Sequence, residues 1–334
     1  MNMGRNTRET WIDIARLLCM LIIIIGHTPC YEKTILEYLT TFHVSIFFIL
    51  SGYLYHPQKF GIEFKKSFVS LIIPYIILGI VNCIYWSFID WHTDGLPMIN
   101  QARTYTTQLL MTHIGLPMVG PLWFLIVLFL LRIGMVFFKS PKTLIPICVV
   151  CAFTAYFIEQ NYHDFQLYAP TNIFLALPFF TCGYLMQSTQ KNWAHKALNV
   201  PKHTRLGLAI LFLILSIVLF WYQGGNNMSM HDYGKNIVTF YICAIFGSFP
   251  IIFLSSLFQI NNQTVLYCLQ TANNGLPLMI GLQITLIHFI KMSIKVYAYH
   301  ITGSIVLSLV IMAITYFLTL LSMKYFPIII GKRQ

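Results

Sequence analysis

The chain has 334 residues, of which 57% are hydrophobic and only 9% are charged. Soluble domains carry about 25% charged residues, so this composition excludes a sizeable soluble catalytic domain and indicates an integral membrane protein. The formal net charge of +11 does not indicate a nucleic-acid partner, because the Lys and Arg residues are scattered between apolar stretches.

Apolar runs bounded by charges, Pro, Gly and Asn predict an all-α polytopic membrane protein. A helix needs about 20 apolar residues to cross the ~30 Å hydrocarbon core, so the chain has room for about ten transmembrane helices. We expect them, in chain order, at residues 11–29, 40–55, 68–89, 121–138, 143–158, 170–186, 206–222, 237–258, 271–289 and 303–326. No internal repeat or linker is evident, so residues 1–334 are expected to form a single domain.

The distribution of Lys and Arg between the predicted loops predicts the orientation. With a cytoplasmic N-terminus, fourteen of these residues lie inside and five outside, which is a positive-inside bias. The inner group is Arg5, Arg8, Lys59, Lys65, Lys66, Lys139, Lys142, Lys191, Lys196, Lys202, Arg205, Lys324, Lys332 and Arg333. The outer group is Lys33, Arg103, Lys235, Lys291 and Lys295. Both termini are therefore expected to be cytoplasmic.

The first predicted helix carries three ionisable residues on one face. Arg16 and His27 are eleven residues apart, so their directions around the helix axis differ by only about 20°. They are separated by about 16 Å along the axis. Asp13 lies one turn before Arg16 and can pair with its guanidinium. Two interpretations stay open. Either Asp13 and Arg16 lie at the membrane interface while His27 ends the helix, or the three line a polar central channel in which His27 is a general base.

A histidine near the start of the second predicted helix is expected to approach His27, because only a short segment connects the two helices. His43 can orient His27, bind a substrate or simply pack in the core. Two histidines without an obvious third ligand do not make a zinc site, so no metal site is expected. Ser51 and Gly52, later in the same helix, permit close packing against another helix.

The fourth predicted helix holds two further candidates. Trp123 either stacks on a sugar or adenine ring or belongs to an interfacial aromatic belt. Arg132, nine residues later, either binds an anion or snorkels to the interface. Several asparagines at the ends of spans are candidates for recognising sugar hydroxyls, or are turn and cap residues: Asn172, Asn226, Asn227, Asn273 and Asn274.

Three motifs occur in a fixed order along the chain. They are Arg16-x10-His27, then Phe42-His43-x3-Phe47-Phe48-x2-Ser51-Gly52-Tyr53, then Leu122-Trp123-Phe124-Leu125. With Pro74-Tyr75, Arg132 and Gly183-Tyr184-Leu185, they make the chain resemble the acyltransferase 3 family of integral membrane acyltransferases. The resemblance is closest to the branch of fucose 4-O-acetylase-like proteins.

This resemblance implies a ten-helix O-acyltransferase of the bacterial inner membrane, with no permanently bound cofactor. Its co-substrate would be an acyl-CoA, usually acetyl-CoA, and its acceptor a sugar hydroxyl of an envelope or surface glycan or a lipid-linked sugar. His27 matches the residue regarded as catalytic in the family, and Arg16 matches its basic partner. His27 would deprotonate the sugar hydroxyl or carry the acyl group itself, and the sequence leaves both routes open.

The chain also departs from the family pattern. Relatives often have two Arg shortly before the Pro-Tyr motif, where this chain has Ser67 and Ser70 with Lys65 and Lys66 just upstream. A histidine often found near the ninth helix is replaced, nearest by Gln283. A transporter or flippase of a lipid-linked sugar is the alternative, because intramembrane charges fit that class from composition alone.

Overall fold

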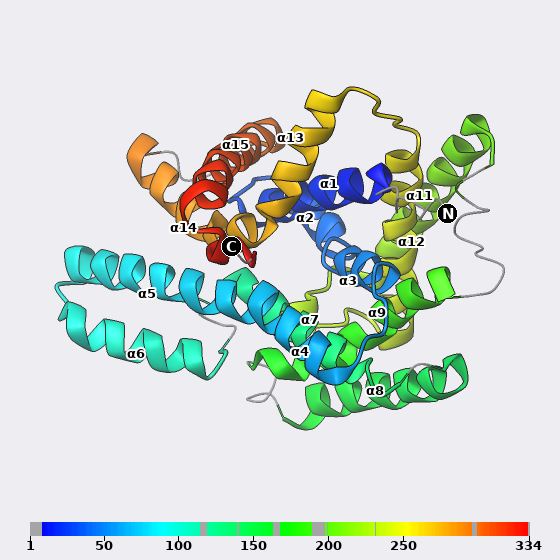
Figure 1. The fold of residues 1–334 in the computed structure, drawn as a ribbon, viewed down its shortest axis with the longest axis horizontal. Coiled ribbons are helices and arrows are strands. Elements are labelled where there is room, and N and C mark those ends of the chain that lie inside the picture. Colours follow the sequence, from blue (N-terminus) through cyan, green and yellow to red (C-terminus); the bar gives the residue numbers. More distant parts are fainter. Residues whose placement is uncertain are drawn as a thin grey trace, which may run out of the picture.

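The computed structural model describes residues 9–113, 119–138, 140–162, 168–188, 198, 200–230, 232–295 and 299–332. These residues form helices joined by short connections, and they contain isolated β-bridges but no strand. The expected all-α fold is confirmed. In Figure 1, α8 runs along one edge of the molecule and α13 and α15 lie along the opposite edge.

Within the described part of the chain, nine helical segments are long and apolar enough to cross a membrane. They are α1 (Thr10–His27), α2 and α3 (Lys33–Tyr53), α4 to α5 (Phe60–Asp94), α8 (Pro141–Asn161), η4 and α9 (Ala169–Gln187), α11 (Lys202–Gln223), α12 (Ile237–Ser256), α14 (Leu276–Ile294) and α15 (Ile301–Tyr325). The predicted span at residues 121–138 is the exception. It is a shorter apolar helix, Gly120–Gly134, made of η2 (Gly120–Leu122) and α7 (Trp123–Gly134).

Two helices that the sequence predicts as continuous are broken. The predicted helix 40–55 is broken near its start, because α2 (Lys33–Thr40) occupies the expected connection and α3 begins only at Ser45 (Ser45–Tyr53). The predicted helix 271–289 is split at Gly275 into α13 (Gln263–Asn274) and α14. The second break follows from Pro277 in the first turn of α14, because proline has no N–H to donate and its ring clashes with the carbonyl four residues earlier.

The third predicted span is longer than expected and has a companion helix. α4 (Phe60–Ser67), a π-helical turn η1 (Phe68–Ile72) and α5 (Ile73–Asp94) run as one segment of 35 residues. The amphipathic helix α6 (Met98–Leu110), which we did not predict, packs back along α5. The two helices form an arm that projects from one side of the molecule (Figure 1).

Two glycines let α3 and α9 (Ile173–Ser188) touch through their backbones. A Cβ on Gly52 would lie 1.9 Å from the carbonyl oxygen of Phe180, and a Cβ on Gly183 would lie 1.8 Å from that of Ile49. Neither position has room for a side chain, so the expected close packing at Gly52 is confirmed. This contact fixes the helix that directly follows His43.

The connections gather at two ends of the helices. At one end, Thr40 of α2 contacts Asn226, which follows α11. Asn172, just before α9, contacts Ser229 in the same connection after α11, so these three segments lie together. We call this the His27 end.

At the other end, Tyr55 bonds to the carbonyl of Arg132, and Gly331 lies against the backbone of Ser70. We call this the Arg132 end, and both described ends of the chain lie there, with Glu9 bonded to Tyr53. The charge pattern predicts that it faces the cytoplasm. Six of the residues behind that prediction lie outside the described residues: Arg5, Arg8, Lys139, Lys191, Lys196 and Arg333.

Candidate functional site

His27 is the last residue of the first membrane-spanning helix. α1 ends there because Thr28 precedes Pro29 and takes an extended conformation, with φ −78° and ψ 142°. The hydroxyl of Thr28 donates to the carbonyl of Ile25 at 2.7 Å and so closes the last turn. The helix end therefore presents an exposed imidazole at the His27 end of the bundle.

The hydrogen bond of His27 determines which ring nitrogen is available for chemistry. Its Nδ1 lies 2.8 Å from the carbonyl oxygen of Ile23. A carbonyl only accepts, so Nδ1–H is the donor and Nε2 of the neutral ring carries the lone pair. Nε2 is thus the atom that can take a proton from a bound alcohol.

His43 lies in the break between α2 and α3 and not inside a helix. The hydroxyls of Thr40 and Thr41 donate to the carbonyls of Glu37 and Tyr38 at 2.8 and 2.7 Å. These bonds compete with the next backbone donors and favour a break in the helix. Nδ1 of His43 donates to the carbonyl of Leu39 at 3.1 Å, so its Nε2 is also an acceptor.

The two histidines share one cavity with a volume of about 230 Å³. Its other lining residues come from α1, α2, α3, α7, α14 and the segment 227–229: Ile23, Gly26, Thr40, Val44, Phe47, Pro121, Trp123, Phe124, Asn227, Met228, Ser229, Ile280 and Gln283. The structure therefore brings together three of the predicted site residues, His27, His43 and Trp123. Asn227 is the predicted asparagine that joins them.

Trp123 is held by its aromatic neighbours as it lines this cavity. The residue is buried, and its ring centroid lies 6.2 Å from that of Phe48 and 6.5 Å from that of Phe124. It is the first residue of α7, directly after the turn that contains Pro121. A buried position inside the bundle differs from that of an interfacial belt residue, which would face lipid headgroups, and the stacking of Trp123 on a substrate ring stays a prediction.

Asp13 and Arg16 lie further along α1 and do not line the described cavity. Asp13 is buried, and its carbonyl accepts from the side chain of Asn273 on α13 at 3.0 Å. Both Asp13 and Arg16 have additional interaction partners. The cavity reaches Ile23 on α1, so a continuous polar channel from Arg16 to His27 stays a prediction.

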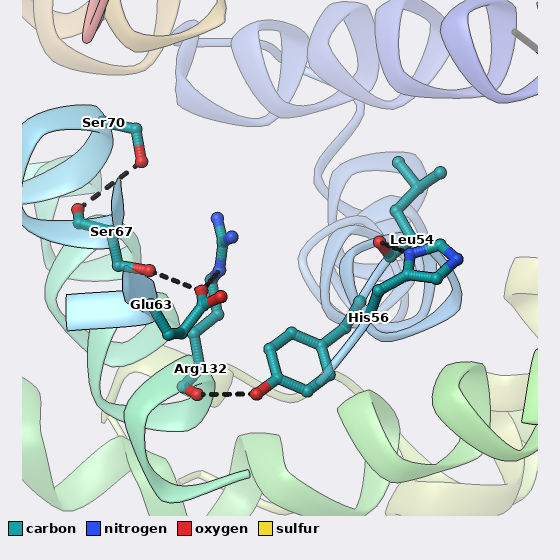
Figure 2. A network of polar contacts seen from close by, with 7 residues as sticks. Leu54, His56, Glu63, Ser67, Ser70 and Arg132 are labelled. Atoms are coloured by element: carbon teal, nitrogen blue, oxygen red, sulfur yellow. Dashed lines mark hydrogen bonds and ion pairs between the residues drawn. The ribbon is translucent and has the colours of Figure 1, made fainter. Parts of the chain in front are cut away.

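Arg132 lies at the opposite end of α7 from Trp123. Its Nε donates to Oε1 of Glu63 at 2.8 Å, and that carboxylate is fully buried. The hydroxyl of Ser67 donates to the same oxygen at 2.8 Å. Figure 2 shows this network, with Arg132 and Ser67 meeting at Glu63. The ion pair anchors one edge of the guanidinium, so Arg132 is not a snorkelling residue.

A surface recess adjoins this ion pair. Arg132 shares it with the exposed side chains of Lys65 and Lys66 and with Ser70 and Gly331. Two exposed ammonium groups beside an anchored guanidinium form a basic surface suited to phosphate groups. Glu63 was not identified from the sequence, where a single acidic residue next to lysines resembles an ordinary solvated helix face.

No group of three or more metal-ligating side chains occurs among the residues that the structure describes. The polar groups near His27 are the second imidazole, amides and hydroxyls. Their chemistry is suited to proton transfer and hydrogen bonding to an alcohol.

The fold and the cavity define a multi-pass membrane protein with paired histidines at one end of its helices. The acyltransferase 3 profile, which describes an acyltransferase domain, matches residues 9–331, so the chain belongs to this family and is a membrane acyltransferase. The match favours the enzyme over the transporter or flippase hypothesis. It does not distinguish branches, so the likeness to fucose 4-O-acetylases stays a prediction. No curated protein and no solved structure matches the chain.

Proposed function

We propose that the protein transfers acetyl from acetyl-CoA to a sugar hydroxyl of an envelope or surface glycan, with His27 as the general base. The observation that carries this proposal is the hydrogen bond from Nδ1 of His27 to Ile23, which leaves Nε2 in a cavity shared with His43 and Trp123. An imidazole held in one tautomer beside an aromatic wall suits deprotonation of a sugar hydroxyl.

The transfer step needs one base and two substrates. Nε2 of His27 takes the hydroxyl proton while the sugar oxygen attacks the thioester carbonyl. The tetrahedral intermediate then breaks its carbon–sulfur bond, and the imidazolium returns the proton to the departing thiolate. The products are the acetyl ester and free coenzyme A. Holding both reactants in one cavity supplies the orientation that this step requires.

The donor is expected to enter from the Arg132 end. Its phosphate groups would bind Lys65, Lys66 and Arg132, which line one recess. Trp123 and Arg132 are nine residues apart on α7, which is about 14 Å along the helix. The pantetheine arm of the donor would span this distance, passing Arg16 and Asp13 on α1.

The family resemblance implies a bacterial inner-membrane location, and the charge pattern supports an orientation with the Arg132 end in the cytoplasm. Acetyl-CoA is then on the side of the basic recess, and the glycan or lipid-linked sugar is on the side of His27. The proposal therefore requires a passage through the bundle that joins the basic recess to the cavity of His27.

Proteoliposomes supplied with radiolabelled acetyl-CoA and a surface glycan test the proposal. We expect acetyl transfer by the natural protein and a decrease of about 10²- to 10⁴-fold for His27→Ala. His92→Ala is the matched control, because this histidine lies at the exposed end of α5. Normal transfer by His27→Ala would refute the base assignment. An acetyl group on His27 itself, seen by peptide mass spectrometry without acceptor, would indicate the covalent route.

A further inference from the structure

Gln283 carries an unused hydrogen-bond acceptor beside the catalytic cavity. The residue is fully buried and lines the cavity of His27. Its Nε2 donates to the carbonyl of Ile280 at 3.3 Å, whereas Oε1 has no partner among the described residues. Turning the amide over would place two oxygens together, so the hydrogen bond to Ile280 favours Oε1 as the free atom.

The helix around Gln283 is held firmly in place. The side chain of Asn82 on α5 donates to the carbonyl of Gly281 at 2.9 Å and accepts from the hydroxyl of Thr285 at 2.9 Å. A Cβ on Gly281 would lie 2.7 Å from Leu78, so α14 and α5 pack closely at this level. These contacts hold α14 in place on both sides of Gln283, which lines the cavity.

The cavity wall is rich in acceptors. Nε2 of His27 and Nε2 of His43 are both acceptors, because each Nδ1–H donates to a backbone carbonyl. The hydroxyl hydrogens of the wall are used inside the protein. Thr40 donates to the carbonyl of Glu37 at 2.8 Å, and Ser229 donates to the side chain of Asn227 at 2.7 Å. A molecule in this cavity can therefore donate hydrogen bonds to His27, His43 and Gln283, while the side chains of Asn227 and Trp123 carry N–H donors for its oxygens.

We propose that Gln283 Oε1 and His43 Nε2 bind a second hydroxyl of the acceptor, next to the hydroxyl that His27 deprotonates. This inference rests on the proposed function. A thioester has no hydrogen to donate, and the reacting hydroxyl gives its only hydrogen to His27. A second hydroxyl on the acceptor molecule would donate to these two groups, and the acceptor is then a sugar with at least two neighbouring free hydroxyls. Gln283 is then a positioning residue that determines specificity.

The test uses a panel of methyl hexopyranosides and their monodeoxy analogues as acceptors, with saturating acetyl-CoA and the full chain in proteoliposomes. For the natural protein, removing the neighbouring hydroxyl should lower kcat/KM about tenfold. Gln283→Met keeps the length of the side chain and removes the acceptor, so the parent sugar and the deoxy analogue should become nearly equal. Gln263→Met is the matched control, because it makes the same change at an exposed glutamine of α13 that does not line the cavity.

Several outcomes would overturn the inference. One is an equal ratio of kcat/KM between parent sugar and deoxy analogue in the natural protein and in Gln283→Met. Another is a natural protein that uses every deoxy analogue as well as the parent sugar, and this result is obtained without any variant. A rise in the KM for acetyl-CoA in Gln283→Met, with acceptor kinetics unchanged, would assign the amide to the donor's pantetheine arm. Gln283→Leu repeats the test if the Met variant does not insert. Transfer to none of the glycosides, with acetyl-CoA still bound, would instead refute the sugar acceptor of the proposed function.

Discussion

The two ends of the molecule use different kinds of polar group. At the His27 end, a largely apolar cavity wall contains two imidazoles whose Nδ1–H groups donate to backbone carbonyls, together with amides and hydroxyls. At the Arg132 end, a buried carboxylate holds a guanidinium, and two exposed ammonium groups lie beside it. The first arrangement presents acceptors of defined orientation, and the second presents positive charge.

This difference shows how one bundle handles two unlike substrates. A proton transfer depends on the position of a single nitrogen, which backbone hydrogen bonds provide. Recognition of phosphate depends on a positive charge held in a fixed position. A buried carboxylate that pairs with one edge of an arginine fixes the guanidinium and leaves its other N–H groups available to phosphate. If the two ends depend on separate interactions, a substitution at one end should leave the function of the other end unchanged.

The largest effect is expected where α3, the helix between the two ends, touches α9. In Gly183→Ala the new Cβ would lie 1.8 Å from the carbonyl oxygen of Ile49, so the helices must separate. We expect a loss of about 3 kcal/mol or more in the free energy of unfolding, together with loss of function at both ends. Thermal unfolding in detergent and acetyl transfer measure the two effects.

Gly207→Ala is the control for that substitution. Gly207 lies inside α11, and a Cβ there would meet nothing within 4 Å. Alanine in a helix interior is more favourable than glycine by roughly 0.5–1 kcal/mol, so this variant should be as stable as the natural protein or slightly more stable. Equal stability of the two alanine variants would contradict the backbone contact.

The next effect separates the two ends. In the natural protein the side chains of Arg132 and Glu63 are 21% and 1% exposed. Arg132→Met therefore leaves a buried carboxylate without its counter-charge. Removing one partner of a buried pair costs about 3–5 kcal/mol, so this variant should unfold well below the natural protein. Adding Glu63→Gln to it should restore much of the loss, because the buried charge is then gone.

The kinetics of the same variants distinguish donor from acceptor binding. In the folded fraction, Arg132→Met should raise the KM for acetyl-CoA severalfold and leave the KM for the sugar unchanged. The reverse pattern, a higher KM for the sugar alone, would mean that the Arg132 end does not receive the donor. If the double variant is no more stable than Arg132→Met, the ion pair does not account for the loss of stability.

The sequence predicts those features that depend on local pattern. The spacing of Arg16 and His27 and the short connection to His43 are local, and the structure brings the two histidines to one cavity. Gly52 predicts close packing because a small residue in an apolar helix has few other roles. Which helix it would touch was not predictable, since Gly183 is more than a hundred residues away.

The features that the sequence missed depend on tertiary contacts or on competing local bonds. The break before His43 arises from two threonine hydroxyls that bond to the preceding turn, which hydropathy does not register. Glu63 looks like a surface residue until α7 places Arg132 beside it. The sequence of the amphipathic α6 is too polar to predict a span. Its position follows from its packing against α5, which is a tertiary contact.

The smallest effect concerns an acid-sensitive contact outside the spans, at the His27 end. Hydrogen bonds from Cys30 and His300 lower the pKa of Glu32 to about 2, and the same carboxylate accepts from the backbone N–H of Ile301 at the start of α15. Because the folded-state pKa is below the ordinary value, this stabilisation is complete above about pH 4.3 and is lost as the pH falls towards 2.

Glu32→Gln should therefore lower the thermal unfolding midpoint slightly at pH 7, and the difference from the natural protein should shrink as the pH falls from about 4.5 towards 2. Glu37→Gln, at an exposed carboxylate of α2, is the matched control and should show no such convergence. A difference that grows in acid would contradict the proposed sign. Acetyl-CoA binding at the Arg132 end should be the same in both variants, because Cys30, His300 and Ile301, which contact the Glu32 carboxylate, all lie at the His27 end.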